Sequence, residues 1–483
     1  MKRMHRRKFL SNSASSLGLL SVASAWPMIG SLTGCQSLER FLMGEDRDSE
    51  TRVLIIGAGL AGMTLAYELK KRKVPYVVFE AKDRTGGKIY SIDAFDGIHA
   101  ADLGASRFYS GDLDFIDLLK ELKVPFVESN KEFDASKKEL LRKMEALWNQ
   151  IYEGKYSSSA NSAISVLVAE NIAGLDLIKA TDFILKIKPK LTSTQTQYLE
   201  QFLLSLAPNV SDVSAFWFLQ SFLRVHKGTE HVIPGGMGLV TKALTQRVSG
   251  LFQDTFLNVG HELVYLDKDE DFFELKFRSS ESGFFKSNRL AKARFLVYAA
   301  PLSQVEGIQL GSMFQWPEPL LKLRSKVGES SQARLVFSVS DKSFQKDLGL
   351  IKNSRFNLGD GMTLSFRDLE NIGNKWGSVI ELEGPSDLIM LGSEQLSVIE
   401  KKISQLLKKD IRITEPMFQK RWNRLHLKTE GYETLQLPYF FQEGHFHFAF
   451  IGETFSKSDF GNVNGAVQSA RMAAEWIQKK ALV

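Results

Sequence analysis

Three glycines and one glutamate between residues 57 and 80 have the types and spacing of a dinucleotide-binding site. Gly57, Gly59 and Gly62 fit the pattern G-x-G-x-x-G, which allows a tight turn, close approach of backbone to a pyrophosphate and close packing of the next helix. Glu80 lies eighteen residues beyond Gly62, where a carboxylate can accept hydrogen bonds from ribose hydroxyls. An acid at that position disfavours a 2′-phosphate, so the spacing predicts FAD or NAD rather than NADP.

The neighbouring residues predict the elements that position these groups. Residues 52–56 are an apolar run rich in β-branched side chains, which indicates a buried strand, and residues 63–73 predict a helix whose N-terminus faces the phosphates. A second strand is predicted over residues 76–79, directly before Glu80. This context favours a ligand-binding unit over a glycine-bearing loop without a ligand.

Four sequence blocks, in order along the chain, resemble the flavin-containing amine oxidase superfamily. Residues 80–88 resemble its E-x-x-x-R-x-G-G-R element, residues 102–107 its D-L-G-A stretch, residues 233–239 its P-G-G-M segment, and residues 452–470 its C-terminal G-E-T and G-A-v-x-S-G block. The resemblance covers roughly residue 52 to the C-terminus. It implies an α/β fold in which a Rossmann-like FAD-binding domain carries an inserted α+β substrate domain.

The resemblance also implies which residues hold FAD. They are Gly57, Gly59, Leu60, Ala61, Gly62, Glu80, Ala81, Arg84, Gly86, Gly87, Lys88, Gly104, Ala105, Ser106, Arg107, Leu263, Gly452, Glu453, Asn464, Gly465 and Ala466. In the family, the C-terminal glutamate, here Glu453, and the following helix N-terminus hold the ribityl chain and the flavin ring. Lys88 stands where the family has arginine, which keeps the charge but loses the guanidinium fork.

Two arginines are candidates for the substrate side of the site. Arg107 resembles the arginine that clamps the substrate carboxylate in L-amino-acid oxidases, and an ion pair at the domain interface is the equally open alternative. Arg334 stands, by register with the strand expected over residues 333–339, where many amine oxidases have a lysine that assists reaction with oxygen. Arginine cannot act as a base near neutral pH, so slow reaction with oxygen is expected unless the nearby Lys326 occupies that position.

An aromatic wall over the flavin is the other feature that the resemblance implies. Trp422 and Tyr432 could supply one side of it, the alternative being ordinary core aromatics. The second aromatic position appears in this sequence as Asn462. That polar replacement weakens a monoamine oxidase assignment and leaves an amino-acid oxidase or another dehydrogenase open.

The N-terminal segment carries most of the net charge and resembles an export signal. Of a formal charge of +6, residues 1–34 contribute +5, so the rest of the chain carries +1 and no basic stripe for nucleic acid is expected. Arg6 and Arg7, followed by Lys8-Phe9-Leu10, resemble a twin-arginine (Tat) signal, which would engage the Tat export machinery. Residues 32–35 resemble a lipobox that ends at Cys35. We therefore expect an exported, periplasmic protein with membrane contact through a lipid anchor.

Cysteine content bounds the chemistry of the folded part. Cys35 is the only cysteine of the 483 residues, so no disulfide, cysteine–zinc site or cysteinyl–flavin bond is expected there. FAD is accordingly expected to be non-covalent, and no metal site is predicted.

The expected organisation divides the chain into seven segments. They are residues 1–35, export signal; 36–50, linker; 51–110, first part of the FAD-binding domain; 111–227, helical part of the substrate domain; 228–303, second part of the FAD-binding domain; 304–420, sheet of the substrate domain; and 421–481, third part of the FAD-binding domain. Helices are expected over residues 137–152, 162–168, 175–185, 194–206 and 465–479, and strands over 295–301, 333–339, 362–366 and 379–383.

The leading hypothesis is an FAD-dependent oxidoreductase that oxidises an amine or L-amino acid by passing a hydride equivalent to the flavin. The imine would hydrolyse, and oxygen (giving hydrogen peroxide) or a membrane electron carrier would reoxidise the cofactor. One alternative is a desaturase or protoporphyrinogen oxidase-like enzyme with a bulky apolar substrate, consistent with 34 phenylalanines. The other is an FAD-binding protein without turnover.

Overall fold

The computed structural model describes most of the chain beyond residue 52. The described residues are 53–94, 98–129, 140–144, 173–207, 211–249, 255–279, 288–339, 355–372, 375–389, 397–398, 400–401, 404–405, 418–431, 435, 439–456 and 458–481. All of them belong to one compact unit, Arg47–Val483.

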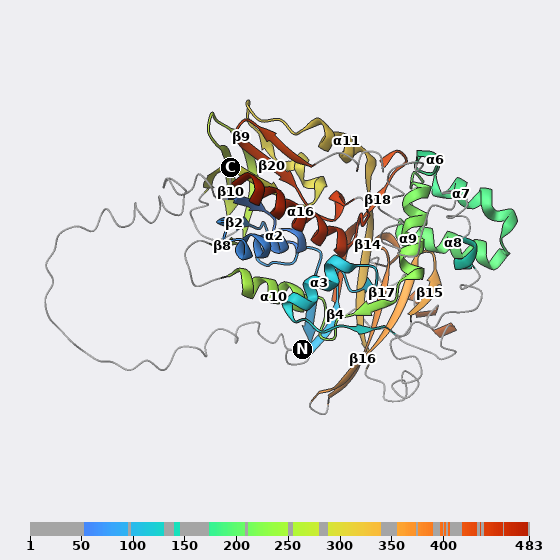
Figure 1. Cartoon of the computed structure of the whole chain (residues 1–483). Helices are drawn as coiled ribbons and strands as arrows, with labels where there is room; N and C mark the ends of the chain where they lie inside the picture. The colour runs from blue at the N-terminus through green and yellow to red at the C-terminus, as the bar shows by residue number, and fades with distance from the viewer. Residues whose placement is uncertain are drawn as a thin grey trace, which may run out of the picture. The chain divides into compact units, whose positions relative to one another are not determined.

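A six-stranded sheet forms the centre of the FAD-binding part (Figure 1). Its order is β19 (Phe440–Glu443), β20 (Phe446–Phe450), β12 (Phe295–Tyr298), β1 (Val53–Ile56), β2 (Tyr76–Phe79) and β8 (Thr255–Asn258). Five strands are parallel, and only the edge strand β19 is antiparallel to its neighbour. Strands from distant parts of the sequence therefore meet in one sheet.

The parallel strands are mainly apolar because both faces of the sheet are covered. Successive residues of a strand point to opposite faces, so Val53 and Ile55 enter one core while Leu54 and Ile56 enter another. The first core is shared with helices α2 (Leu60–Lys71), α3 (Leu113–Leu122), α10 (Gly238–Val248) and α16 (Val463–Ala481).

An antiparallel sheet covers the other face of the parallel sheet. Its order is β11 (Asn288–Ala293), β10 (Phe273–Ser279), β9 (His261–Lys268) and β13 (Gln309–Leu310), the last being parallel to β9. Phe277 of β10 stacks on Phe79 of β2 with 4.0 Å between ring centroids. The second core is thus built from aromatic and aliphatic side chains of both sheets.

The strands expected over residues 52–56 and 76–79 are present as β1 and β2, but the helix between them starts earlier than expected. α2 begins at Leu60 because Gly59 has the extended backbone of an N-cap, so Gly62 lies in the first helical turn. The helix ends with Arg72 as its C-cap, and Lys73 has a positive φ of 57°.

A five-stranded antiparallel sheet forms the substrate part. Its order is β15 (Arg355–Gly359), β16 (Met362–Ile372), β17 (Lys375–Pro385), β14 (Val327–Val339) and β18 (Phe418–Leu427). The strands expected over residues 333–339, 362–366 and 379–383 lie within β14, β16 and β17. The boundary expected between residues 420 and 421 falls inside β18, which pairs with β14 through Leu427. The fold therefore continues the substrate sheet past that point.

Helices on the substrate side follow the expected periodicity with one interruption. They are α6 (Ala173–Asp176), α7 (Ala180–Ile187), η2 (Lys188–Lys190), α8 (Ser193–Leu206) and α9 (Ala215–Lys227). The single helix expected over residues 175–185 is split, because Lys179 is extended and forms a β-bridge with Ser214. Of the helix expected over 137–152, residues 140–144 are described, and residues 162–168 lie outside the described part.

Short elements connect these layers. They are β3 (Ser91–Ala94), β4 (Ile98–Asp102), β5 (Phe108–Tyr109), β6 (Val127–Glu128), β7 (Glu230–Val232), η3 (Leu302–Gly307), α11 (Glu318–Lys326), α13 (Ser386–Ile389) and η4 (Glu453–Phe455). β7 pairs with β5 and β6, so the second FAD-domain segment returns beside residues 108–128. None of the helices in the described residues is both long and apolar enough to cross a membrane.

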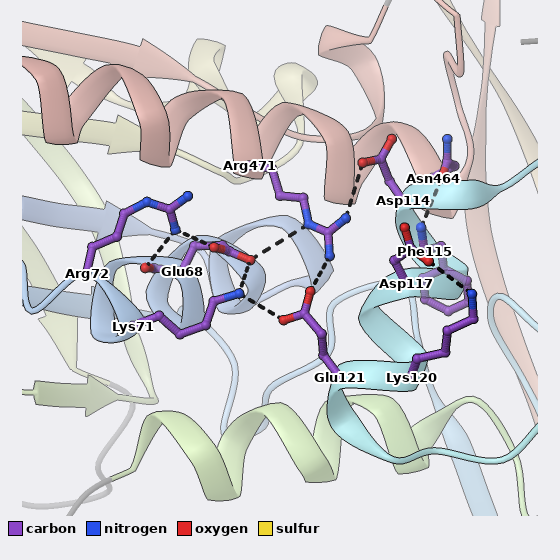
Figure 2. A network of polar contacts seen from close by, with 10 residues as sticks. All are labelled: Glu68, Lys71, Arg72, Asp114, Phe115, Asp117, Lys120, Glu121, Asn464 and Arg471. Carbon is purple, nitrogen blue, oxygen red and sulfur yellow. Dashed lines mark hydrogen bonds and ion pairs between the residues drawn. The ribbon is translucent and has the colours of Figure 1, made fainter.

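A network of charged side chains joins three helices of the FAD-binding part (Figure 2). Glu68 of α2 is buried and lies beside Lys71 at 2.7 Å, Arg72, and Arg471 of α16 at 3.7 Å. Glu121 of α3 contacts Lys71 at 2.8 Å and Arg471 at 2.7 Å. The network links α2, α3 and α16 in addition to their apolar core.

Replacing Glu68 by glutamine is expected to lower the free energy of unfolding by about 2 kcal/mol at neutral pH, between the values for exposed and buried ion pairs. Burial raises the pKa of Glu68, but hydrogen bonds from Lys71 and Arg72 outweigh burial and hold that pKa below 4.5. A carboxyl with a lowered pKa stabilises the fold above its unfolded pKa, and this stabilisation is lost as the pH falls through the folded pKa.

The difference in the free energy of unfolding between wild type and E68Q should therefore shrink as the pH falls below 4.5. Urea unfolding at neutral pH and at about pH 3.5 measures it. Asp117→Asn is the control, because the Asp117–Lys120 pair is exposed on α3 and its loss should change little. A difference that stays constant over this pH range would contradict the assignment.

Candidate active site

The glycine turn after β1 is shaped by close backbone contacts. Gly57 has a φ of +101°, which disfavours other residues, and a Cβ there would lie 3.0 Å from the Ala299 carbonyl oxygen. A Cβ on Gly62 would lie 1.9 Å from the Gly57 carbonyl oxygen, so only glycine fits between helix and strand. A Cβ on Gly59 would meet only the Cα of Gly87, at 3.9 Å. Packing and backbone conformation thus restrict Gly57 and Gly62, whereas the space beside Gly59 is open.

Glu80 braces this turn from the end of β2. Its Oε2 accepts a hydrogen bond from the Ala58 N–H at 2.7 Å, and its Oε1 accepts one from the Lys82 N–H at 3.0 Å. The side chain is buried yet lines a cavity. Because a carboxylate has about four acceptor positions, it retains acceptors for ligand hydroxyls.

The turn and Glu80 line a cavity of about 560 Å³, called here the dinucleotide cavity. From the expected cofactor set it is lined by Gly57, Gly59, Leu60, Ala61, Glu80, Ala81, Gly86, Gly87, Lys88, Ala105, Leu263, Gly452, Glu453 and Ala466. Its volume lies in the range of ligand sites. The N-terminus of α2 reaches it through Leu60 and Ala61, which suits a pyrophosphate. These residues fit FAD.

Other members of the expected cofactor set lie next to the dinucleotide cavity and support its walls. Arg84 donates hydrogen bonds to the carbonyls of Thr85 and Gly87, both at 3.0 Å, and its guanidinium lies 4.3 Å from the Tyr90 ring centroid. Asn464 is buried, and its Oδ1 accepts from the Phe115 N–H at 2.9 Å. These two side chains therefore hold loops and helices in position.

Two further glycines of the expected set occupy crowded backbone positions. A Cβ on Gly104 would lie 1.9 Å from the Lys88 carbonyl oxygen, and one on Gly465 would lie 2.3 Å from the Asp459 carbonyl oxygen. Gly465 lies in the first turn of α16. Both glycines permit close packing of the segments that enclose the cavities.

A second cavity, of about 260 Å³, adjoins the first and is called here the arginine cavity. Seven residues line both cavities: Lys88, Ala105, Trp422, Asn423, Leu425, Glu453 and Val463. The arginine cavity is lined in addition by Leu103, Gly104, Ser106, Arg107, Tyr109, Arg224, Val225, Gln332, Ala333, Arg334, Glu383, Arg424, Gly461 and Asn462. It therefore lies between the FAD-binding part and the substrate sheet.

Arg334 makes three polar contacts with the walls of the arginine cavity. Its Nη1 donates to the carbonyls of Asp102 at 2.5 Å and Gly104 at 2.9 Å, and its Nη2 lies 2.7 Å from Glu383. Lys326, the alternative at this register, pairs instead with Glu430 and does not line either cavity. Arg334 thus fixes the loop after β4 against the substrate sheet.

Arg107 lines the arginine cavity but already has an acidic neighbour. Its Nε lies 3.6 Å from Oε1 of Glu230, which is buried at the start of β7. This contact is the one expected if Arg107 forms an ion pair instead of binding a substrate carboxylate. A substrate carboxylate would have to share the guanidinium with Glu230.

The aromatic and polar residues that the sequence predicts over the flavin differ in which cavity they line. Trp422 lines both cavities, and its Nε1 donates to the Leu103 carbonyl. Asn462 lines the arginine cavity, while its Oδ1 accepts from the N–H groups of Asn464 at 2.9 Å and Gly465 at 3.2 Å, which caps the N-terminus of α16. Tyr432 lies outside the described residues.

Sequence reasoning missed two arginines and an acid of this site. Arg424 could have been found by strand alternation, since it lies two residues from Trp422 in β18 and side chains of a strand repeat every second residue. Glu383 lies opposite Arg334 in the sheet register, which needs the strand pairing to be known. Arg224 gives no local signal, because its partner Asp112 precedes it by 112 residues.

Replacing Glu80 by glutamine is expected to weaken FAD binding about 10- to 100-fold, the usual effect of losing a hydrogen bond to a charged acceptor. Glutamine keeps one acceptor for the Ala58 N–H, so the turn should persist. Glu262→Gln is the matched control, because Glu262 also lines the dinucleotide cavity but is largely exposed. Equilibrium dialysis of FAD against apoprotein measures the effect. An equal loss of FAD affinity in both variants, or no loss of FAD affinity in E80Q, would contradict a role of Glu80 in binding FAD.

The fold and the two cavities define a class: a two-domain α/β flavoprotein with a Rossmann-like FAD-binding domain and a substrate domain. The family model for flavin-containing amine oxidoreductases matches residues 60–340, more than half of the chain. The chain therefore belongs to the flavin-containing amine oxidoreductase family. It is an FAD-dependent oxidoreductase.

Similar proteins agree at the level of the fold. The structure matches putrescine oxidase bound to putrescine with a TM-score of 0.65 and 15% identity, covering 89% of this chain and 99% of that one. It matches cyclohexylamine oxidase from Brevibacterium oxydans with a TM-score of 0.64 and 17% identity, covering 90% of this chain and 100% of that one.

Curated relatives are similar over short segments only. Mitochondrial protoporphyrinogen oxidase of Nicotiana tabacum is 39% identical over 80 residues, which are 16% of each protein. The 1-hydroxycarotenoid 3,4-desaturase of a Flavobacterium is 42% identical over 57 residues, 12% of this chain and 11% of that protein. The chain thus spans less than a fifth of the length of either relative.

Proposed function

We propose that this protein oxidises an amine or L-amino acid bound in the arginine cavity, with FAD in the dinucleotide cavity. The observation that carries the proposal is the wall of seven residues common to both cavities. A molecule in the arginine cavity would lie directly beside the part of the cofactor that this wall contacts. When bound, FAD supplies the two-electron acceptor. The imine product would hydrolyse to an oxo compound and ammonia, or to a shortened amine.

The residues of the shared wall would orient the substrate rather than transfer protons. Lys88 and Glu453 form an ion pair of 2.5 Å that joins the first and last FAD-binding segments where the cavities meet. Trp422 offers an indole face to both cavities. Tyr432 would add a second aromatic side chain. Asn462 would narrow the far side as the residue that caps α16.

Reduction of the bound flavin in the absence of oxygen tests the proposal. Purified holoprotein is mixed anaerobically with a panel of L-amino acids and a panel of simple amines, and loss of the flavin absorption band is followed. We expect bleaching by members of at least one panel. Bleaching by neither would overturn the proposal. Arg107→Ala alongside wild type shows whether Arg107 clamps a carboxylate, because only then would bleaching by amino acids be lost while bleaching by amines remains.

Oxygen and a membrane electron carrier are both proposed as acceptors, and Arg334 bears on the choice. Its guanidinium stays charged and is held by Glu383 and two carbonyls, so it offers no proton-accepting group for a step with oxygen. We expect faster turnover under argon with an artificial acceptor than in air. Equal or faster turnover in air would contradict use of a carrier.

A bulky apolar substrate, as for a desaturase, has less support. The short matches to protoporphyrinogen oxidase and a carotenoid desaturase favour it. Against it, no phenylalanine is found among the described residues that line the arginine cavity, while five cations are. A cavity lined by five cations suits a small charged substrate better than a hydrocarbon.

We also propose export by the Tat route and a lipid anchor at Cys35, with residues 36–50 as the linker. The support is the sequence of residues 1–35 alone, which lies outside the described residues. Cys35→Ser should move the protein from the membrane fraction to the soluble periplasmic fraction. Replacing Arg6 and Arg7 by lysine should instead retain it in the cytoplasm. A wild-type protein found in the cytoplasm would contradict both.

A further inference from the structure

The cations that line the arginine cavity differ in whether they have an ion-pair partner. Five cationic side chains line it: Lys88, Arg107, Arg224, Arg334 and Arg424. Four of them have a carboxylate partner: Lys88 with Glu453 at 2.5 Å, Arg107 with Glu230 at 3.6 Å, Arg224 with Asp112 at 2.7 Å, and Arg334 with Glu383 at 2.7 Å. The fifth, Arg424, forms no ion pair with any described carboxylate.

Arg424 is held in place by a neutral partner. Its Nη1 donates to the Ser205 carbonyl at 2.8 Å, and this is the polar contact of its guanidinium within the described residues. Gln332 donates to the same carbonyl at 3.0 Å, which fixes the acceptor between two side chains of the sheet. Because a guanidinium has five N–H donors, Arg424 retains donors for a ligand.

The substrate sheet aims Arg424 into the cavity. In β18, Trp422 and Arg424 are two residues apart and share one face of the sheet. In the neighbouring β14, Gln332 lies opposite Trp422, and Arg334 two residues on points the same way. All four line the arginine cavity, so this face of the sheet forms its floor.

Burial and the neighbouring charges shift the pKa of Arg424, some lowering it and some raising it. Burial lowers the pKa of Arg424, Glu383 opposes that effect, and Arg224 and Arg334 lower the pKa further. Glu383 is already hydrogen-bonded to Arg334. Since an arginine side chain stays protonated, Arg424 offers a positive charge and N–H donors to an anion in the cavity.

We propose that Arg424 anchors a carboxylate of the substrate, which makes the substrate an amino acid or another amino-carboxylate rather than a simple amine. The inference rests on the proposed function and deepens it. Arg424 lines the cavity without a carboxylate partner among the described residues, and its guanidinium fork can bind both oxygens of a carboxylate. Arg107 suits this role less, because Glu230 already faces it. Leu103, Val225 and Leu425 give the rest of the substrate an apolar surface.

The test compares two ligands that differ in charge and cannot be oxidised as amines. Binding of 3-phenylpropanoate and of its neutral amide, 3-phenylpropanamide, is measured by titration calorimetry on the oxidised holoprotein. We expect the acid to bind about 10- to 100-fold more tightly than the amide, the usual effect of a hydrogen bond to a charged group. In Arg424→Gln this preference should fall to near unity, with binding of the amide unchanged.

A second variant protects the test against misfolding. Arg424→Lys keeps the charge but not the fork, so acid binding should weaken about 3- to 10-fold relative to the amide while the preference keeps its sign. The control removes the Arg107 ion pair without changing the net charge, by Arg107→Gln together with Glu230→Gln. This double variant should still bind the acid more tightly than the amide. FAD content and circular dichroism verify the fold of each variant.

Several results would overturn the inference. Wild type could bind the acid and the amide equally, or Arg424→Gln could still prefer the acid. Arg424→Lys could prefer the acid as strongly as wild type does, or the Arg107/Glu230 double variant could lose the preference for the acid. The first result would not touch the proposed oxidation, because simple amines could still bleach the flavin. Conversely, a clear carboxylate preference without bleaching by any amine or amino acid would leave the Arg424 site intact and overturn the proposed function.

Discussion

Gly62→Ala is expected to lower the free energy of unfolding by about 3 kcal/mol or more, the upper part of the range for overpacked positions. The added Cβ would lie 1.9 Å from the Gly57 carbonyl oxygen and 3.3 Å from the Ala299 Cβ. Neither β1 nor α2 can move away easily, because apolar cores hold both faces of the sheet. Urea unfolding of the apoprotein measures the loss.

Gly59→Ala is the matched variant, in the same motif and with the same added atom. Here the Cβ would meet only the Gly87 Cα at 3.9 Å, and φ is −71°, which alanine adopts freely. The apoprotein should therefore be nearly as stable as wild type, while FAD binding weakens because Gly59 lines the dinucleotide cavity. Stability losses of equal size in the two variants would contradict this division of roles.

Arg334→Met is expected to lower the free energy of unfolding by about 3 kcal/mol, the cost of removing one partner of a buried ion pair. The Arg334 side chain is 8% exposed, and its replacement removes the donor that Arg334 offers to Glu383 and to the carbonyls of Asp102 and Gly104. The second carbonyl belongs to Gly104, which lines the arginine cavity. The variant should therefore also raise the KM for the substrate that the enzyme oxidises. Steady-state kinetics measures this KM, and urea unfolding measures the loss of stability.

Two further variants separate charge from geometry at this position. Arg334→Lys keeps the charge but cannot reach two carbonyls and Glu383 together, so an intermediate loss of about 1–2 kcal/mol is expected. Glu383→Gln keeps an acceptor for Arg334 and should cost about 1 kcal/mol. If Arg334→Met were as stable as wild type, the guanidinium would not hold the loop.

The FAD-binding part could be predicted closely because its signals are local. A strand, a glycine turn and a helix occupy consecutive residues, and sterics of the turn and the adjoining strand require glycine at positions 57 and 62. The strand over residues 76–79 and the helix over 194–206 likewise follow from periodicity. Where a tertiary contact intervened, as at Lys179 bridging to Ser214, the expected helix was interrupted.

The sequence alone determined the class of cofactor, the α/β fold and three of the cations that line the arginine cavity, Lys88, Arg107 and Arg334, since these depend on residue types and short spacings. The partner of each cation was decided only by the tertiary structure. Lys88 meets Glu453 across 365 residues, and Arg334 meets Asp102 across 232. Periodicity carries no information on contacts of that range, because they depend on how sheets and helices pack. For the same reason only the packed structure shows that, of the cations that line the arginine cavity, Arg424 is the one without a carboxylate partner among the described residues.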